Sequence, residues 1–129
     1  MKFLAKYSEE AYSLLRIMAG FMLTMHGMQK LLGVFADKQP TVGSQSWFGG
    51  MIELIGGLFI LFGFQTRWAA FIASGMLADA YFQFHWKFQF DSNFFPLVNH
   101  GELAVLYCLV FLFIATKGGG KWSADGVKG

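Results

Sequence analysis

Four long apolar runs fill most of this chain, and each of them contains ionisable side chains. The runs cover approximately residues 11–33, 47–64, 67–86 and 97–116. Each is close to the roughly 20 residues that a helix needs to cross the hydrocarbon core of a bilayer. The sequence therefore predicts an all-α fold, a four-helix transmembrane bundle whose neighbouring helices are antiparallel and whose ionisable groups face inward.

Composition supports a membrane protein, because 55% of the residues are hydrophobic and 14% are charged, against roughly 25% charged in an ordinary soluble domain. In 129 residues, four spans leave no room for a separate soluble catalytic module. We predict one transmembrane domain over residues 1–129. The first run is long and contains Arg16, so we interpret it as a retained helix and not as a cleaved signal peptide.

The connections suggest the topology. Residues 63–67 are a short link, which predicts a hairpin of the second and third helices. Lys and Arg collect on cytoplasmic flanks, and the side of the chain termini carries more of them: Lys2, Lys6, Arg67, Lys117, Lys121 and Lys128 against Lys30, Lys38 and Lys87. We therefore predict a multi-pass membrane protein with both termini cytoplasmic, which in a bacterium would place it in the cytoplasmic (inner) membrane. A net charge of +2 gives no argument for a nucleic-acid partner.

Counting depth along each run at about 1.5 Å per residue places one polar cluster in the outer half of the membrane. Its members come from all four predicted helices: His26 and Lys30, Glu53, Asp79, and His100 and Glu102. His85 lies at a helix end and is interpreted as an interfacial side chain. Buried acids in a bilayer must be paired, protonated or hydrated. The cluster therefore indicates either interhelical ion pairs that fix the bundle or a site for a ligand and protons.

Helical periodicity of about 100° per residue predicts which faces point inward. Arg16, Gly20, Leu23, Gly27 and Lys30 form a narrow stripe on the first helix. On the second helix, Gly49, Glu53 and Gly57 share a small-residue face that permits close helix approach. Asn99 and Glu102, three residues apart, should share a face of the fourth helix.

Metal and haem are both disfavoured by the residue pattern. His26 and His100 could supply the two axial ligands of a haem, but their surroundings are charged and the sequence has no second such pair. His100 and Glu102 lie about 200° apart on a helix, which does not suit one di-metal site. The sole cysteine, Cys108, has no metal-ligand spacing. We predict no bound metal.

The chain resembles the DoxX-like family of small four-helix membrane proteins over nearly its whole length. The resemblance rests on an ordered set of motifs: Arg16 to Gly20 (RIMAG), His26 to Leu31 (HGMQKL), Glu53 to Leu58 (ELIGGL), Gly63 to Arg67 (GFQTR), Asn99 to Ala104 (NHGELA) and Gly118 to Asp125 (GGGKWSAD). Asp79 departs from the family pattern, in which this position is mostly apolar. It either extends the polar cluster or is neutral and hydrogen-bonded to Gln83.

The resemblance implies quinone-coupled oxidation of sulfur compounds, as in the membrane subunit of thiosulfate:quinone oxidoreductase, or a place in membrane complexes for redox or thiol stress. The leading hypothesis is a quinone-linked oxidoreductase subunit in which Glu53 and Glu102 carry protons and His26 or Lys30 binds a quinone carbonyl. The polar cavity would also include Arg16, Asp79, Asn99 and His100. Electrons would come from partner redox subunits or a substrate. The alternative function is a non-enzymatic accessory or stabilising subunit of a larger respiratory or transport complex. The expected partners are other membrane or redox subunits, or further copies of the chain in a homo-oligomer.

Overall fold

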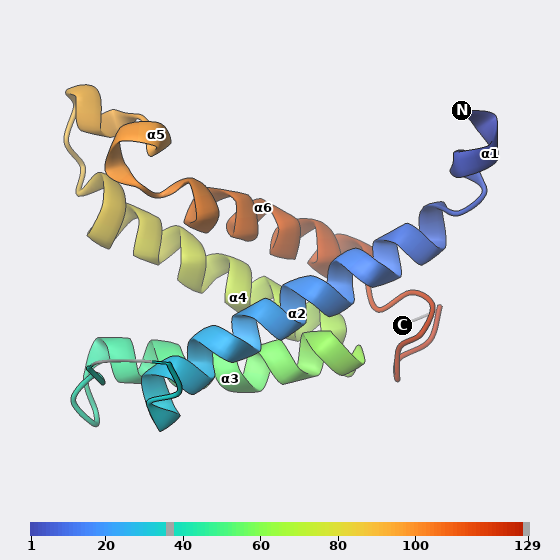
Figure 1. Cartoon of the computed structure of the whole chain (residues 1–129), viewed down its shortest axis with the longest axis horizontal. Coiled ribbons are helices and arrows are strands. Elements are labelled where there is room, and N and C mark those ends of the chain that lie inside the picture. Colours follow the sequence, from blue (N-terminus) through green and yellow to red (C-terminus); the bar gives the residue numbers. More distant parts are fainter. Residues whose placement is uncertain (36–37, 128–129) are drawn as a thin grey trace.

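The computed structural model describes residues 1–35 and 38–127, and the regular secondary structure of these residues is entirely helical. Four main helices form the fold, and consecutive ones run antiparallel (Figure 1): α2 (Ser8–Leu32), α3 (Gln45–Phe62), α4 (Thr66–Ala80) and α6 (Glu102–Lys117). Short elements complete it: α1 (Lys2–Ala5), the π-helix η1 (Tyr81–Trp86) that continues α4, the 3₁₀ turn η2 (Ser92–Phe94) and α5 (Pro96–Asn99). The predicted all-α fold of four main antiparallel helices is confirmed.

The main helices associate as two pairs. α2 packs along α3, α4 packs along α6, and the pairs meet mainly where α3 contacts α4. Figure 1 shows that the pairs lie close together at the end near the chain termini and diverge toward α5.

Glycines allow α2 and α3 to approach closely. A Cβ atom on Gly20 would lie 2.5 Å from the Leu61 backbone nitrogen, and one on Gly57 would lie 2.5 Å from Thr24 Oγ1. Gly27 is tighter still, against the backbone of Leu54. These contacts confirm the predicted small-residue interface, and Arg16 and Leu23 of the same α2 stripe are also buried.

The predicted fourth helix over residues 97–116 is interrupted. His100 adopts a left-handed conformation, with φ of 60°, and separates α5 from α6. Asn99 fixes the break, since its Oδ1 accepts from the Gly101 N–H at 2.8 Å and its Nδ2 donates to the Asn93 carbonyl at 2.9 Å. The prediction that Asn99 and Glu102 share a helix face is therefore wrong: Asn99 is buried and Glu102 is exposed.

By length and composition, α3 is the one helix among the described residues that passes as a membrane span on its own. α4 and α6 contain 15 and 16 residues, because the π-helix and the break at His100 divide the longer apolar runs. α2 has 25 residues but includes Arg16, His26 and Lys30.

A C-terminal tail, residues 118–127, folds back over the end of the bundle near the chain termini. The Tyr12 hydroxyl donates to the Gly118 carbonyl at 2.5 Å, and Ser13 Oγ donates to the Lys121 carbonyl at 2.7 Å. The Asp125 N–H donates to the Gly63 carbonyl at 2.8 Å. The tail thus connects the start of α2 with the turn between α3 and α4.

Asp125 caps the N-terminus of α4 from this tail. Its Oδ2 accepts from the Thr66 N–H at 2.8 Å and from Thr66 Oγ1 at 2.7 Å, and its Oδ1 accepts from the Gln65 N–H at 2.9 Å. Gln65 precedes the helix in a left-handed conformation and gives no side-chain cap of its own. A residue about 60 positions away in the sequence thus satisfies N–H groups that would otherwise lack partners at this helix start.

Asp125→Asn is expected to lower the free energy of unfolding by about 1 kcal/mol at pH 7, because the amide keeps one acceptor oxygen and places an NH2 donor where the other carboxylate oxygen accepted hydrogen bonds. Burial acts to raise the pKa of Asp125, but hydrogen bonds from Thr66 and Gln65 and the charge of Arg16 outweigh burial, so this pKa lies below its ordinary value of 3.8. A carboxyl group with a lowered folded-state pKa stabilises the fold above its unfolded-state pKa. That contribution is lost as the pH falls through the lowered value.

The measurement is thermal unfolding of both proteins in detergent from pH 7 down to about pH 2. The difference between wild type and Asp125→Asn should shrink below about pH 4. A difference that stays constant over this range would show that the carboxylate charge of Asp125 contributes nothing to the cap.

Candidate functional site

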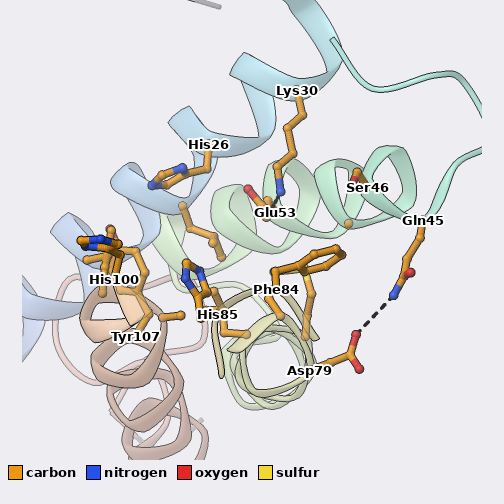
Figure 2. Close-up of a pocket in the computed structure, with 17 residues that line it drawn as sticks. His26, Lys30, Gln45, Ser46, Glu53, Asp79, Phe84, His85, His100 and Tyr107 are labelled. Carbon is orange, nitrogen blue, oxygen red and sulfur yellow. Dashed lines mark hydrogen bonds and ion pairs between the residues drawn. The ribbon is translucent and has the colours of Figure 1, made fainter. Parts of the chain in front are cut away.

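A cavity of about 430 Å³ opens between the two helix pairs at the end where they diverge. Figure 2 shows side chains from α2, α3, α4 with η1, and α6 around it. Its polar lining includes His26, Lys30, Glu53, Asp79, His85, His100 and Tyr107, and its apolar lining includes Leu23, Met76 and Leu77. The volume lies in the range of about 300–1,000 Å³ that is usual for small-molecule sites.

An ion pair between α2 and α3 forms one wall of the cavity. Lys30 Nζ lies 2.5 Å from Glu53 Oε1, and Figure 2 shows the lysine side chain extending toward the carboxylate. Glu53 is 6% exposed, while Lys30 is about one-third exposed at the side chain. A Cβ atom on Gly50 would lie 2.9 Å from Lys30 Cβ, so the absence of a side chain there makes room for the lysine.

A second polar group lies where α3 begins beside the end of α4. Gln83 Nε2 donates to Asp79 Oδ1 at 2.8 Å, the contact named in one of the two alternatives for Asp79, while the cavity lining includes Asp79 as in the other. Gln45 Nε2 also donates, to Gln83 Oε1 at 3.2 Å and to Asp79 Oδ2 at 3.4 Å. Asp79 is exposed at the cavity edge, so these contacts connect α3 to α4 at the mouth of the cavity.

The π-helix η1 brings two consecutive side chains, Phe84 and His85, to the cavity. π-helical turns are rare and often occur at functional sites. His85 Nδ1 lies 3.3 Å from the Asn99 carbonyl oxygen. We interpreted His85 from the sequence as an interfacial side chain, and the structure places it in the cavity lining beside His100.

Tyr107 of α6 lines the cavity and was not predicted as a site residue. It is 7% exposed, and its ring lies edge-on to that of His26, with 6.3 Å between the ring centroids. Its helical spacing could have identified it, because Leu103, Ala104 and Tyr107 share one face of α6 and all line the cavity. The apolar sequence around Tyr107 gave no other signal.

Three predicted cavity residues lie elsewhere. Arg16 is fully buried near the tail, where it donates to main-chain carbonyls. Asn99 is buried at the helix break, and Glu102 is exposed in the first turn of α6. The structure thus brings together His26, Lys30, Glu53, Asp79 and His100 and leaves the other three outside the cavity lining. Over residues 1–35 and 38–127, no three His, Cys, Asp or Glu side chains converge in a way that could hold a metal ion.

Comparison with known proteins identifies the family. The family model described as DoxX matches residues 11–86, which include α3, α4, η1 and nearly all of α2. A Haemophilus influenzae protein described as an uncharacterized protein is 36% identical over 135 residues, covering 97% of this chain and 96% of the relative. No solved structure matches the chain. The extent of these two matches shows that the chain belongs to the DoxX family of membrane proteins.

Proposed function

We propose that the protein is an integral membrane subunit of a quinone-linked oxidoreductase and that its cavity binds the quinone head group. The observation that carries the proposal is the combination, in one cavity of about 430 Å³, of an apolar lining with the Lys30–Glu53 ion pair. Quinone head groups need both surfaces, because an apolar ring carries carbonyl oxygens that accept hydrogen bonds. Small-molecule sites typically combine apolar lining with a few convergent polar groups in this way.

The proposal includes a topology in which all four main helices cross the inner membrane and both termini are cytoplasmic. α4 and η1 together extend over residues 66–86, and α5 and α6 over residues 96–117, which are lengths that suit a bilayer crossing. Large apolar side chains are exposed on the outer faces, among them Phe21, Phe62 and Trp68, as lipid contact requires. The cavity then lies in the outer half of the membrane.

In this proposal, different residues of the cavity bind different parts of the quinone. Lys30 Nζ, already directed into the cavity wall by Glu53, donates to one carbonyl oxygen of the quinone. The exposed His26 ring on α2 is the second candidate donor. Leu23, Met76 and Leu77 contact the ring. The bound quinone supplies the two-electron acceptor.

Proton and electron balance defines the role of Glu53. Reduction of a quinone to a hydroquinone takes up two electrons and two protons, and a partner subunit that oxidises a reduced sulfur compound supplies the electrons. Glu53 donates protons to the carbonyl oxygen, and after each transfer water at the cavity mouth reprotonates it. A positioned carboxyl group can act as a general acid in this way. Glu102 has no part in this proposal because it is exposed outside the cavity lining.

Glu53→Gln is expected to reduce quinone-dependent turnover in native membranes about tenfold or more, since a positioned acid–base group commonly contributes at least that much. The matched control is Glu102→Gln, the same chemical change at an exposed site of α6, which should leave turnover unchanged. Both rates are divided by the amount of folded protein in the membrane. Equal rates for wild type and Glu53→Gln would contradict the proposed proton route.

A second function is supported by the same ion pair. Lys30 and Glu53 connect α2 to α3, as expected of an accessory subunit whose charges only fix its helices. That function predicts that Glu53→Gln lowers stability while turnover per folded protein is unchanged. It also predicts stoichiometric copurification with larger membrane chains and no bound small molecule, which mass spectrometry of the gently purified complex would detect.

A further inference from the structure

The Tyr107 hydroxyl is a buried polar group without a hydrogen-bond partner among the described residues. Its ring belongs to the lining of the cavity. Buried hydroxyls are normally hydrogen-bonded, because leaving one unpaired forfeits the bonds it made with water. The hydroxyl is buried and belongs to a residue that lines the cavity, so a ligand that enters the cavity is a candidate for its missing partner.

Two comparisons within the chain show that packing alone does not account for this hydroxyl. Tyr12 is equally buried, at 5% exposed, and its hydroxyl is bonded to the Gly118 carbonyl. Phe111, one turn after Tyr107 on α6, is completely buried with no hydroxyl, and the two rings lie 5.5 Å apart. The chain contains 16 Phe and 4 Tyr, so where a ring alone is needed in an apolar helix it generally uses Phe.

We propose that the Tyr107 hydroxyl donates a hydrogen bond to a carbonyl oxygen of the ligand in the cavity, which makes Tyr107 a positioning residue for a quinone-type ring. This inference rests on the proposed function. The ring of His26 lies edge-on to the Tyr107 ring from α2. Because the Tyr107 hydroxyl is buried, this proposal includes a rotation of the exposed His26 ring on ligand binding, and Tyr107 then takes the place of His26 as the second donor.

This arrangement gives the ligand two points of attachment from different helix pairs. Lys30 lies on α2, where it pairs with Glu53 of α3, while Tyr107 lies on α6. A ring with two carbonyl oxygens on opposite sides offers one acceptor to each donor. Within the proposed function, the two carbonyl oxygens of a 1,4-dicarbonyl ring are therefore assigned to Lys30 and Tyr107.

The test measures binding of decylubiquinone to the purified full chain in nanodiscs, using wild type, Tyr107→Phe and Tyr12→Phe. Tyr107→Phe removes only the hydroxyl and should weaken binding about threefold to tenfold, as expected for one lost hydrogen bond. The infrared band of the bound quinone carbonyl should shift toward its frequency without a hydrogen bond. The thermal midpoint of the unliganded protein should stay the same or rise, because an unpaired polar group has been removed.

Tyr12→Phe is the matched control and should behave in the opposite way. It breaks the bond to Gly118, so its thermal midpoint should fall while its affinity and carbonyl band match those of wild type. If decylubiquinone binds wild type and Tyr107→Phe equally, with the same carbonyl band, the role of Tyr107 is wrong and the proposed function stands. If wild type does not bind decylubiquinone, both proposals are overturned.

Discussion

Arg16→Ala is expected to lower the free energy of unfolding by about 3–5 kcal/mol, the combined effect of unsatisfied buried carbonyls and a large-to-small change in the core. Arg16 is fully buried. Its Nη1 donates to the Ile60 and Leu61 carbonyls at 2.7 and 2.9 Å, and its Nη2 donates to the Trp122 carbonyl at 2.8 Å. Removing the guanidinium leaves these carbonyls short of donors and opens a cavity between α2, α3 and the tail.

The matched control is Arg67→Ala. Arg67 also donates to main-chain carbonyls, those of Ala115, Thr116 and Lys117 at the end of α6, but it is exposed. Water can replace an exposed donor, so we expect a loss of about 1 kcal/mol or less. Unfolding of both variants by SDS titration in mixed micelles gives the comparison. Equal losses would show that burial does not determine the contribution of Arg16.

Gly27→Ala is expected to lower the free energy of unfolding by about 3 kcal/mol, at the upper end of the usual effect of overpacking. The added methyl group would overlap the backbone of Leu54, so α2 and α3 would have to separate. Backbone cannot turn aside as the end of a side chain can. Separation of the helices would also move Lys30 away from Glu53, so the proposed function predicts weaker quinone binding in this variant than in wild type.

Gly75→Ala provides the control for this substitution. Gly75 lies in the interior of α4, and a Cβ atom there meets no atom within 4 Å. Because alanine favours the helix over glycine by about 1 kcal/mol, Gly75→Ala should be neutral or stabilising. Thermal unfolding in detergent measures the stability of both variants against that of wild type. A stable Gly27→Ala protein would mean that the α2–α3 contact is looser than these distances indicate.

The sequence predicted features of the fold that depend on helical periodicity. Periodicity predicted an inward stripe on the first helix and a small-residue face on the second, and these faces meet in the contact between α2 and α3. The depth count placed Lys30 and Glu53 in the same half of the membrane, where they form an ion pair. Both inferences needed only the regular geometry of a helix, which the described parts of α2 and α3 follow closely.

The features that sequence reasoning missed depend on contacts between distant residues. Asn99 ends α5 because its side chain forms hydrogen bonds with Asn93 and Gly101. No local sequence pattern identifies those partners. Counting through residues 97–116 as one helix therefore placed Glu102 in the cavity. The partners of Arg16 are backbone carbonyls, which every residue carries, so the sequence could not show that this cation belongs to the tail contact and not to the cavity.

The tail contact sets an order for biosynthesis. Residues 121 and 122, whose carbonyls accept hydrogen bonds from Arg16, leave the ribosome after all four main helices have been made. Until then, the Arg16 guanidinium of a nascent chain can donate to the α3 carbonyls but not to those of the tail. An intermediate of this kind carries an incompletely solvated cation in its first long helix, which distinguishes it from a finished molecule. We expect cellular proteases to degrade this intermediate faster than the finished protein, so a chain that lacks the tail from residue 118 onward should have a shorter lifetime than wild type.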